Sequence, residues 1–217
     1  MSKGRFITFE GGEGSGKSTQ ARRLAERLRA AGRDVLLTRE PGGSPFAEQV
    51  RGLLLGGTLA PHPPIAEALL FSAARADHLA TSIRPALEAG RWVICDRFAD
   101  STRVYQGAAG GVPDGDLDVL ERLVVGPTTP DLTLILDIDA RAGLARATTR
   151  REAIEGSEID PFESRALAFH ETLRRGYLEI ARREPARCVV IDAAADVERI
   201  AADIWQHVAS RLHPDAA

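Results

Sequence analysis

The residues whose types and spacing could do chemistry begin at positions 11–18, which spell Gly-Gly-Glu-Gly-Ser-Gly-Lys-Ser. They match the pattern G-x-x-x-x-G-K-[ST], after a short apolar run at 6–9 and before a helical run at 19–31. Glycines let several backbone N–H groups point inward, and the helix N-terminus adds positive potential, so a loop of this kind binds phosphate. We expect contacts to a nucleoside triphosphate from Gly11, Gly12, Glu13, Gly14, Ser15, Gly16, Lys17, Ser18 and Thr19.

Two side chains of this loop have specific expected roles. Lys17 can reach the terminal phosphates, and the hydroxyl of Ser18 can bind Mg²⁺. The alternative is a glycine-rich turn with one solvated lysine. We favour the phosphate loop because every fixed position matches, and because the chain has only one other lysine, Lys3, among its many arginines.

The composition is that of a globular protein without a charge bias toward nucleic acid or membranes. The 217 residues, 44% hydrophobic and 27% charged, suit a single domain over 1–217. The formal net charge is −3, and no apolar run approaches the ~20 residues that span a bilayer. No signal-peptide core follows Met1. Cys95 and Cys188 lie in apolar runs, which favours buried free thiols over a disulfide and predicts a cytoplasmic protein.

Five short runs predict the strands of a buried parallel sheet. Their centres are continuously apolar rather than alternating, as in strands covered on both faces. The expected strands are residues 5–10, 34–38, 91–96, 132–137 and 187–192. Helical patterns separate them, so the fold class is α/β, with a five-stranded parallel sheet of the P-loop type covered by helices on both faces.

Two of the intervening helices have informative patterns. Ser44 can cap a helix that has Pro45 at its first position. A longer helical pattern has apolar residues spaced by four and three, at Phe162, Ala166, Phe169, Leu173, Tyr177 and Ile180.

Arginines follow three of the predicted strands, where ligands of such sheets bind. Arg39 follows the second strand, Arg97 the third, and an arginine cluster at 141–151 the fourth. A guanidinium group matches phosphate oxygens bidentately, although a single arginine is more often a surface ion-pair partner. Convergence of all three groups on one sheet edge predicts a second, phosphate-bearing ligand. A GTP-dependent switch is disfavoured because the chain has no asparagine and no lysine after Lys17 for a guanine-reading motif. A nucleoside-monophosphate or small-metabolite kinase fits better.

Several segments together resemble bacterial thymidylate kinases, in the order and spacing of that family, from the N-terminus to about residue 183. The matching segments are Glu10-Gly11-Gly12-Glu13-Gly14-Ser15-Gly16-Lys17-Ser18, Arg39-Glu40-Pro41-Gly42-Gly43, Phe71-Ser72-Ala73-Ala74-Arg75, Asp96-Arg97-Phe98, Tyr105-Gln106-Gly107 and Pro130-Asp131-Leu132-Thr133.

The resemblance implies a site for the thymine nucleotide. Phe71 would stack on the base, although core packing is its alternative role, and Arg75 one turn later would donate to the 4-oxo group. Tyr105 would crowd the ribose 2′ position. Further base contacts would come from Ser101, Thr102 and Gln106, and the acceptor phosphate would bind Arg39, Arg51 and Arg97.

The resemblance also assigns the catalytic groups. The phosphate loop has no basic residue at its variable positions, so the chain resembles the members with catalytic arginines on a mobile lid, here at about 146–160. Asp96 would support the waters of Mg²⁺ bound to Ser18. The implied catalytic residues are Lys17, Arg97, Arg146, Arg150, Arg151 and Glu13.

The implied reaction is phosphoryl transfer from ATP to dTMP, with Mg²⁺ as cofactor and a homodimer as the expected assembly. The acceptor is an anionic phosphate oxygen, so alignment and charge neutralisation suffice without a strong general base. Two alternatives remain: a kinase of the same architecture for another nucleoside or monophosphate, and a slow ATP-hydrolysing switch. Acceptor-dependent ADP release separates them.

Overall fold

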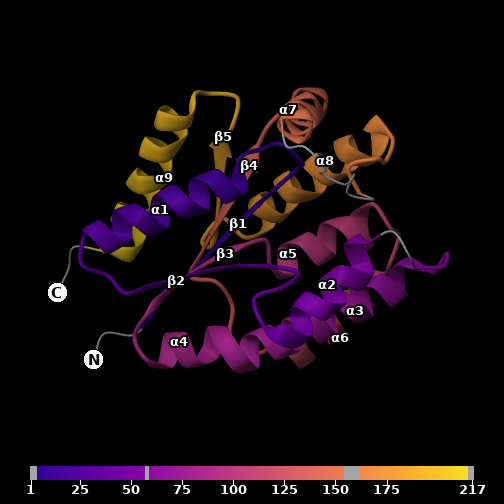
Figure 1. Ribbon diagram of the computed structural model, residues 1–217, viewed down its shortest axis with the longest axis horizontal. Helices are drawn as coiled ribbons and strands as arrows, with labels where there is room; N and C mark the ends of the chain where they lie inside the picture. The colour runs from indigo at the N-terminus through magenta and orange to yellow at the C-terminus, as the bar shows by residue number, and fades with distance from the viewer. Residues whose placement is uncertain (1–3, 57–58, 154–161, 215–217) are drawn as a thin grey trace.

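A computed structural model describes residues 4–56, 59–153 and 162–214 (Figure 1). The five predicted strands are all present, with ends that differ from expectation by at most one residue. They are β1 (Phe6–Gly11), β2 (Val35–Arg39), β3 (Trp92–Asp96), β4 (Leu132–Asp137) and β5 (Cys188–Asp192). They form one parallel sheet in the order β2-β3-β1-β4-β5. The α/β fold with a parallel five-stranded sheet is therefore confirmed.

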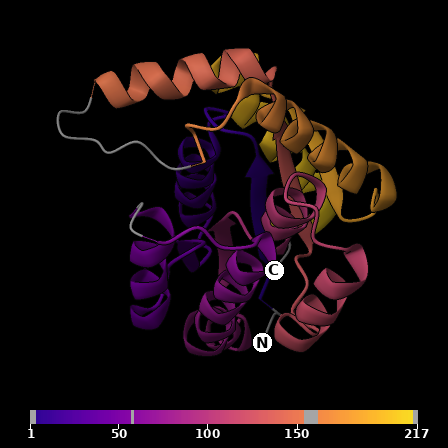
Figure 2. The ribbon, with the colours of Figure 1, turned by 90° about the vertical axis from the view of Figure 1, so that its right-hand side faces the viewer.

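Helices connect the strands and cover both faces of the sheet (Figures 1 and 2). On one face α1 and α9 bury Ala21, Leu24 and Ile204 against the sheet. On the other face Phe6 and Val93 pack with Ile83, and Leu173 packs with Ile135. The helices are α1 (Lys17–Ala30), α2 (Pro45–Leu55), α3 (Pro64–His78), α4 (Arg84–Glu88), α5 (Ala99–Thr102), α6 (Asp114–Val124), α7 (Ala140–Glu152), α8 (Leu167–Arg183) and α9 (Val197–Leu212), with π-helical turns η1 (Leu79–Ile83) and η2 (Arg103–Ala108).

The starts predicted for two helices, α2 and α8, can be compared with the structure. The Ser44 hydroxyl accepts from Ala47 N–H at 3.3 Å, with Pro45 in the first turn, so the predicted cap of α2 is confirmed. The start predicted for the long helix is wrong. Ala166 has an extended backbone (ψ 151°), α8 begins at Leu167, and Phe162 lies in a turn before it. The apolar pattern extends before the N-terminus of the helix because Phe162, although outside the helix, is partly buried against other aromatic rings.

Two further expectations can be compared with the fold. Cys95 and Cys188 are buried free thiols, as predicted. No helix in the described part of the chain is long and apolar enough to cross a membrane.

The predicted lid at about 146–160 coincides partly with α7, which runs across one end of the molecule in Figure 2. Residues 154–161 lie outside the described residues.

Candidate active site

The phosphate loop connects β1 to α1 at the carboxyl edge of the sheet. Gly16, in the left-handed region at φ 90°, immediately precedes α1. Lys17 Nζ donates to the carbonyl oxygens of Gly12 at 2.7 Å and Gly11 at 3.1 Å. Burial and the nearby Arg97 charge lower the pKa of Lys17 to about 8, against the opposing pull of Glu13, Asp96 and Glu10. A lysine so enclosed gains strongly from a phosphate partner.

Close contact with α7 fixes the outer side of this loop. Gly14 has φ 65°, and a Cβ built there would lie 1.9 Å from the carbonyl oxygen of Gly143. A Cβ on Gly143 would lie 2.4 Å from the carbonyl oxygen of Glu13. Both positions therefore require glycine, since any side chain would push the predicted lid helix away from the phosphate loop.

The predicted metal-binding residues lie together at the mouth of the loop. The hydroxyl of Ser18, at the start of α1, donates to Asp96 Oδ2 at the end of β3. Ser18 is exposed and Asp96 half-buried, and both line a polar cavity beside the loop. A hydroxyl and a carboxylate that leave room for water fit Mg²⁺, which keeps several water ligands.

Two cavities meet at this edge of the sheet. The first contains the phosphate loop together with four arginines from separate parts of the chain, Arg39, Arg51, Arg97 and Arg150. The second extends away from the loop and has an aromatic wall of Phe71, Phe98, Tyr105 and Phe162. The cavities share Glu13, Glu40, Arg51 and Arg97. The predicted substrate residues that line the second cavity are Arg51, Phe71, Arg75, Arg97, Ser101, Thr102, Tyr105 and Gln106, whereas Arg39 lines the first.

Arg97 stands between the two cavities in a strained conformation. It has φ 69°, in the left-handed region that non-glycine residues seldom adopt. Its guanidinium donates to Glu13 Oε1 at 2.7 Å and to the hydroxyl of Tyr177 at 3.1 Å. Burial alone would raise the pKa of Glu13, but the charges of Arg97 and Lys17 and the Tyr105 hydroxyl lower it to about 2. The site therefore holds Arg97 and an ionised Glu13 as a pair.

Arg75 is buried in a hydrogen-bonding network around Glu40. Arg75 Nε donates to Glu40 Oε2 at 2.7 Å, and Nη2 donates to the carbonyl oxygen of Phe98 and to Thr102 Oγ1, both at 3.1 Å. Nη1 makes no hydrogen bond with the described residues, and Arg75 lines the second cavity. The network thus fixes one edge of the guanidinium and leaves another for a ligand.

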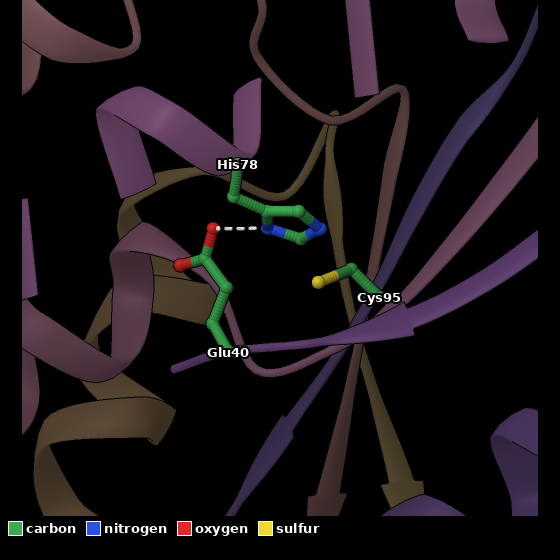
Figure 3. A group of neighbouring side chains, drawn as sticks. All are labelled: Glu40, His78 and Cys95. Atoms are coloured by element: carbon green, nitrogen blue, oxygen red, sulfur yellow. Dashed lines mark hydrogen bonds and ion pairs between the residues drawn. The ribbon is translucent and has the colours of Figure 1, made fainter. Parts of the chain in front are cut away.

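The same network accounts for a buried group of potential metal ligands, Glu40, His78 and Cys95, shown in Figure 3. His78 Nδ1 pairs with Glu40 Oε1 at 3.1 Å, and its Nε2 pairs with Thr38 Oγ1 at 2.8 Å. Burial raises the pKa of the Cys95 thiol well above its usual range, and the thiol donates to a backbone carbonyl. These hydrogen bonds account for every potential ligand atom of the group, and His78 helps to hold Glu40 in place beside Arg75.

The three candidate catalytic arginines of α7 differ in their surroundings. Arg146 donates to the carbonyl oxygens of Ala193 and Ala194, beyond β5. Arg150 and Arg151 each donate to Glu163, and only Arg150 of these three lines the phosphate cavity. Which of them acts in catalysis stays a prediction.

Comparisons with known proteins agree with this geometry. The family model described as "Thymidylate kinase" matches residues 9–204. Thymidylate kinases of Caulobacter vibrioides and Bradyrhizobium diazoefficiens are 58% and 53% identical, covering 98% and 99% of this chain and 99% and 93% of their own. The chain belongs to the thymidylate kinase family. A crystal structure of thymidylate kinase from Ehrlichia chaffeensis has a TM-score of 0.77 and 33% identity, covering 95% of this chain and 99% of that one.

Within this thymidylate kinase fold, several site residues were missed by sequence reasoning. Glu10, fully buried, accepts from Phe98 N–H at 2.8 Å and from the Ser101 hydroxyl at 2.6 Å. Glu40 anchors Arg75. Phe162 packs edge-on to Tyr105, with ring centroids 5.5 Å apart. Two signals were available: Glu10 is a charged residue inside an apolar strand, and Glu10 and Glu40 both lie in segments that resemble the family.

Proposed function

We propose that this chain transfers the γ-phosphoryl group of ATP to dTMP, giving dTDP and ADP. The observation that carries the proposal is the junction of the two cavities at Glu13 and Arg97. One cavity has a phosphate loop, and the other has an aromatic wall with polar groups at its edge. Two nucleotides bound in them would meet phosphate to phosphate, as phosphoryl transfer between them requires.

The donor would bind with its phosphates on the loop. Inward N–H groups over residues 11–19, the α1 N-terminus and Lys17 would hold them. Mg²⁺ would be held by Ser18, with Asp96 supporting its water ligands, and would supply charge neutralisation on the donor oxygens. The hydrogen bond between Ser18 and Asp96 supports this assignment because it brings both oxygens to one exposed corner of the cavity.

The acceptor would bind in the second cavity. Phe71 would stack on thymine, and Arg75 Nη1 would donate to its 4-oxo group, which is an acceptor where cytosine carries a donor. Ser101, Thr102 and Gln106 would contact the base edge, and Tyr105 would favour the deoxyribose. Arg39, Arg51 and Arg97 would bind the phosphate.

The chemistry would need alignment and charge neutralisation more than proton removal. The acceptor oxygen is already anionic, and Arg97 and Lys17 would offset the repulsion between the two phosphate groups. We assign the catalytic lid arginine to Arg150 first, because it lines the phosphate cavity, with Arg146 and Arg151 as its alternatives. An arginine of this kind is worth a rate factor of about 10³–10⁵.

We further propose a homodimer formed through α3 and α6. These helices pack together and expose Leu69 (52%), Val119 (52%) and Leu123 (79%) to solvent. Apolar side chains gathered on neighbouring helices are typical of subunit interfaces. The cytoplasmic location stays a prediction.

Coupled ADP release tests the function. With ATP and Mg²⁺, we expect rapid turnover with dTMP and much slower turnover with dCMP, dGMP and the ribonucleotide of thymine, with dUMP as the closest competitor. Preference for another monophosphate would indicate the alternative kinase. ATP hydrolysis that no acceptor accelerates would indicate the nucleotide-dependent switch and would overturn the proposal.

A further inference from the structure

His170 is a buried imidazole without a hydrogen-bonding partner in the described part of the chain. It lies in the first turn of α8, its exposed fraction is 4%, and neither Nδ1 nor Nε2 bonds to a described residue. Nearly all buried polar groups are paired, and an unpaired one costs about 1–3 kcal/mol. A polar ring kept in this place needs a partner other than these protein atoms.

The ring lines a small, partly open cavity that residues of the phosphate loop also line. His170, Arg174 and Tyr177 recur at i, i+4 and i+7, so they share one face of α8. The helix itself packs against β1 and β4 (Figure 1). All three line this cavity, whose opposite wall includes Gly11, Gly12 and Glu13. The space open to the centre of a water molecule is about 20 Å³, and about 10–15 Å³ suffices for one water.

The other polar side chains of this helix face already have partners. Arg174 donates to both oxygens of Asp137, at 2.6 and 2.9 Å. Tyr177 contacts Arg97 and Ser101 at 3.1 and 3.0 Å. His170 is therefore the member of this face whose hydrogen-bonding capacity is left for the cavity.

Glu13 is the residue through which this cavity can affect the reaction. Glu13 lines the cavity. Burial alone would raise its pKa, but Arg97, Lys17 and Tyr105 lower it, and the charge of His170 lowers it by a smaller amount. Glu13 also accepts from Arg97 and from the Tyr105 hydroxyl, at 2.7 and 2.6 Å. A shift of the Glu13 segment would therefore move the arginine between the two nucleotide sites.

We propose that His170 is a positioning residue, which holds the Glu13 segment of the phosphate loop through one water bound between the imidazole and the loop. The water satisfies one ring nitrogen and bonds to a polar atom of the loop. His170 does not touch either nucleotide. It acts on kcat through the alignment of Glu13 and Arg97, and this effect on kcat rests on the function proposed above.

Two variants of this position test the proposal. His170→Phe keeps a ring of similar size without polar atoms, whereas His170→Gln keeps a hydrogen-bonding group. We expect His170→Phe to lower kcat for dTMP about tenfold, which corresponds to about 1.4 kcal/mol, at an equal or higher melting temperature. His170→Gln should retain most of kcat, and both variants should keep the KM values for ATP and dTMP within a few-fold. His207→Phe, in α9 away from the loop, is the matched control and should keep full kcat.

A crystal structure of the unliganded wild type gives a readout independent of activity. We expect an ordered water within about 3.2 Å of a His170 ring nitrogen and of a loop atom, and we expect no such water in His170→Phe. A wild-type cavity without that water, full kcat in His170→Phe, or equal losses of kcat and melting temperature in both variants would overturn the proposal. A wild type inactive on dTMP would refute the function above, while the crystal structures would still decide the water site.

Discussion

Glu10 shows how an enclosed carboxylate can organise a site without touching a ligand. It lies at the end of β1, and its two oxygens accept from Phe98 N–H and the Ser101 hydroxyl. Burial and the charge of Asp100 raise the pKa of Glu10 to about 7, while its hydrogen-bond donors and Arg97 act in the opposite direction. Its protonation state therefore changes near neutral pH, next to the strained residue Arg97.

This shift predicts a pH-dependent contribution to stability. The native pKa lies above the unfolded value of about 4.5, so the native state binds more protons between these values. The contribution of Glu10 is fully present below about pH 4.5 and is lost as the pH rises through about 7. Glu10→Gln removes the titration, since its amide can accept from Phe98 N–H and donate to Ser101. The stability of Glu10→Gln relative to wild type should be higher at about pH 8 than at about pH 5, measured by urea denaturation. A difference that does not change with pH would refute the prediction.

Arg75 is a second residue whose buried partner decides the effect of a substitution. Removing its guanidinium leaves the Glu40 carboxylate, 6% exposed, without that charge partner, at a cost of about 3–5 kcal/mol. An activity loss in Arg75→Met would therefore mix base recognition with instability. Adding Glu40→Gln to Arg75→Met should raise the free energy of unfolding relative to Arg75→Met, because it removes the unpaired charge and keeps the acceptor for His78. Glu40→Gln alone should lower the free energy of unfolding relative to wild type. Denaturant titration of the four proteins measures both signs, and a double variant less stable than Arg75→Met would contradict this account.

Among the secondary-structure elements, the strands were predictable because continuously apolar runs are typical of strands buried on both faces. The start of α8 was not, because the same spacing by three and four also fits a partly buried ring in a turn, Phe162, and an exposed residue before the helix, Ala166. The motif residues of the site were found from their order along the chain. Glu10 and Glu40 lie in the same segments, but their roles as buried partners were not predicted, since pairings such as Glu40 with Arg75 form only after distant elements pack.

The contact between α7 and the phosphate loop predicts opposite effects for two similar substitutions. Alanine normally stabilises a helix relative to glycine by about 0.5–1 kcal/mol. Gly115→Ala in α6 should show this gain, because nothing lies within 4 Å of a Cβ built there. Gly143→Ala in α7 should instead lower the free energy of unfolding and raise the KM for ATP, because its Cβ would lie 2.4 Å from the carbonyl oxygen of Glu13. Urea denaturation and ATP titrations compare the two, and a stabilised Gly143→Ala with unchanged KM would refute the close contact.

At the scale of the whole molecule, the proposed dimer would cover the exposed apolar side chains of α3 and α6. Leu123, 79% exposed, lies with Val119 on α6, and Leu69 lies on the neighbouring α3. A second copy placed on this surface by a two-fold axis would bury the same residues on both chains. The two cavities of the candidate active site are not lined by these three residues, so assembly and chemistry can be tested separately.

Charge placed on this surface should separate the subunits. We expect the wild type to have twice the mass of one chain in size-exclusion chromatography with light scattering. Leu123→Glu should have the mass of a single chain, because a dimer would bury two carboxylates against apolar side chains. Val197→Glu, at the first turn of α9 and also exposed, is the matched control and should stay dimeric, since glutamate is favourable at a helix N-terminus. A wild type that remains a monomer at the highest concentration measured, or a Leu123→Glu variant that remains a dimer, would show that this surface has another role.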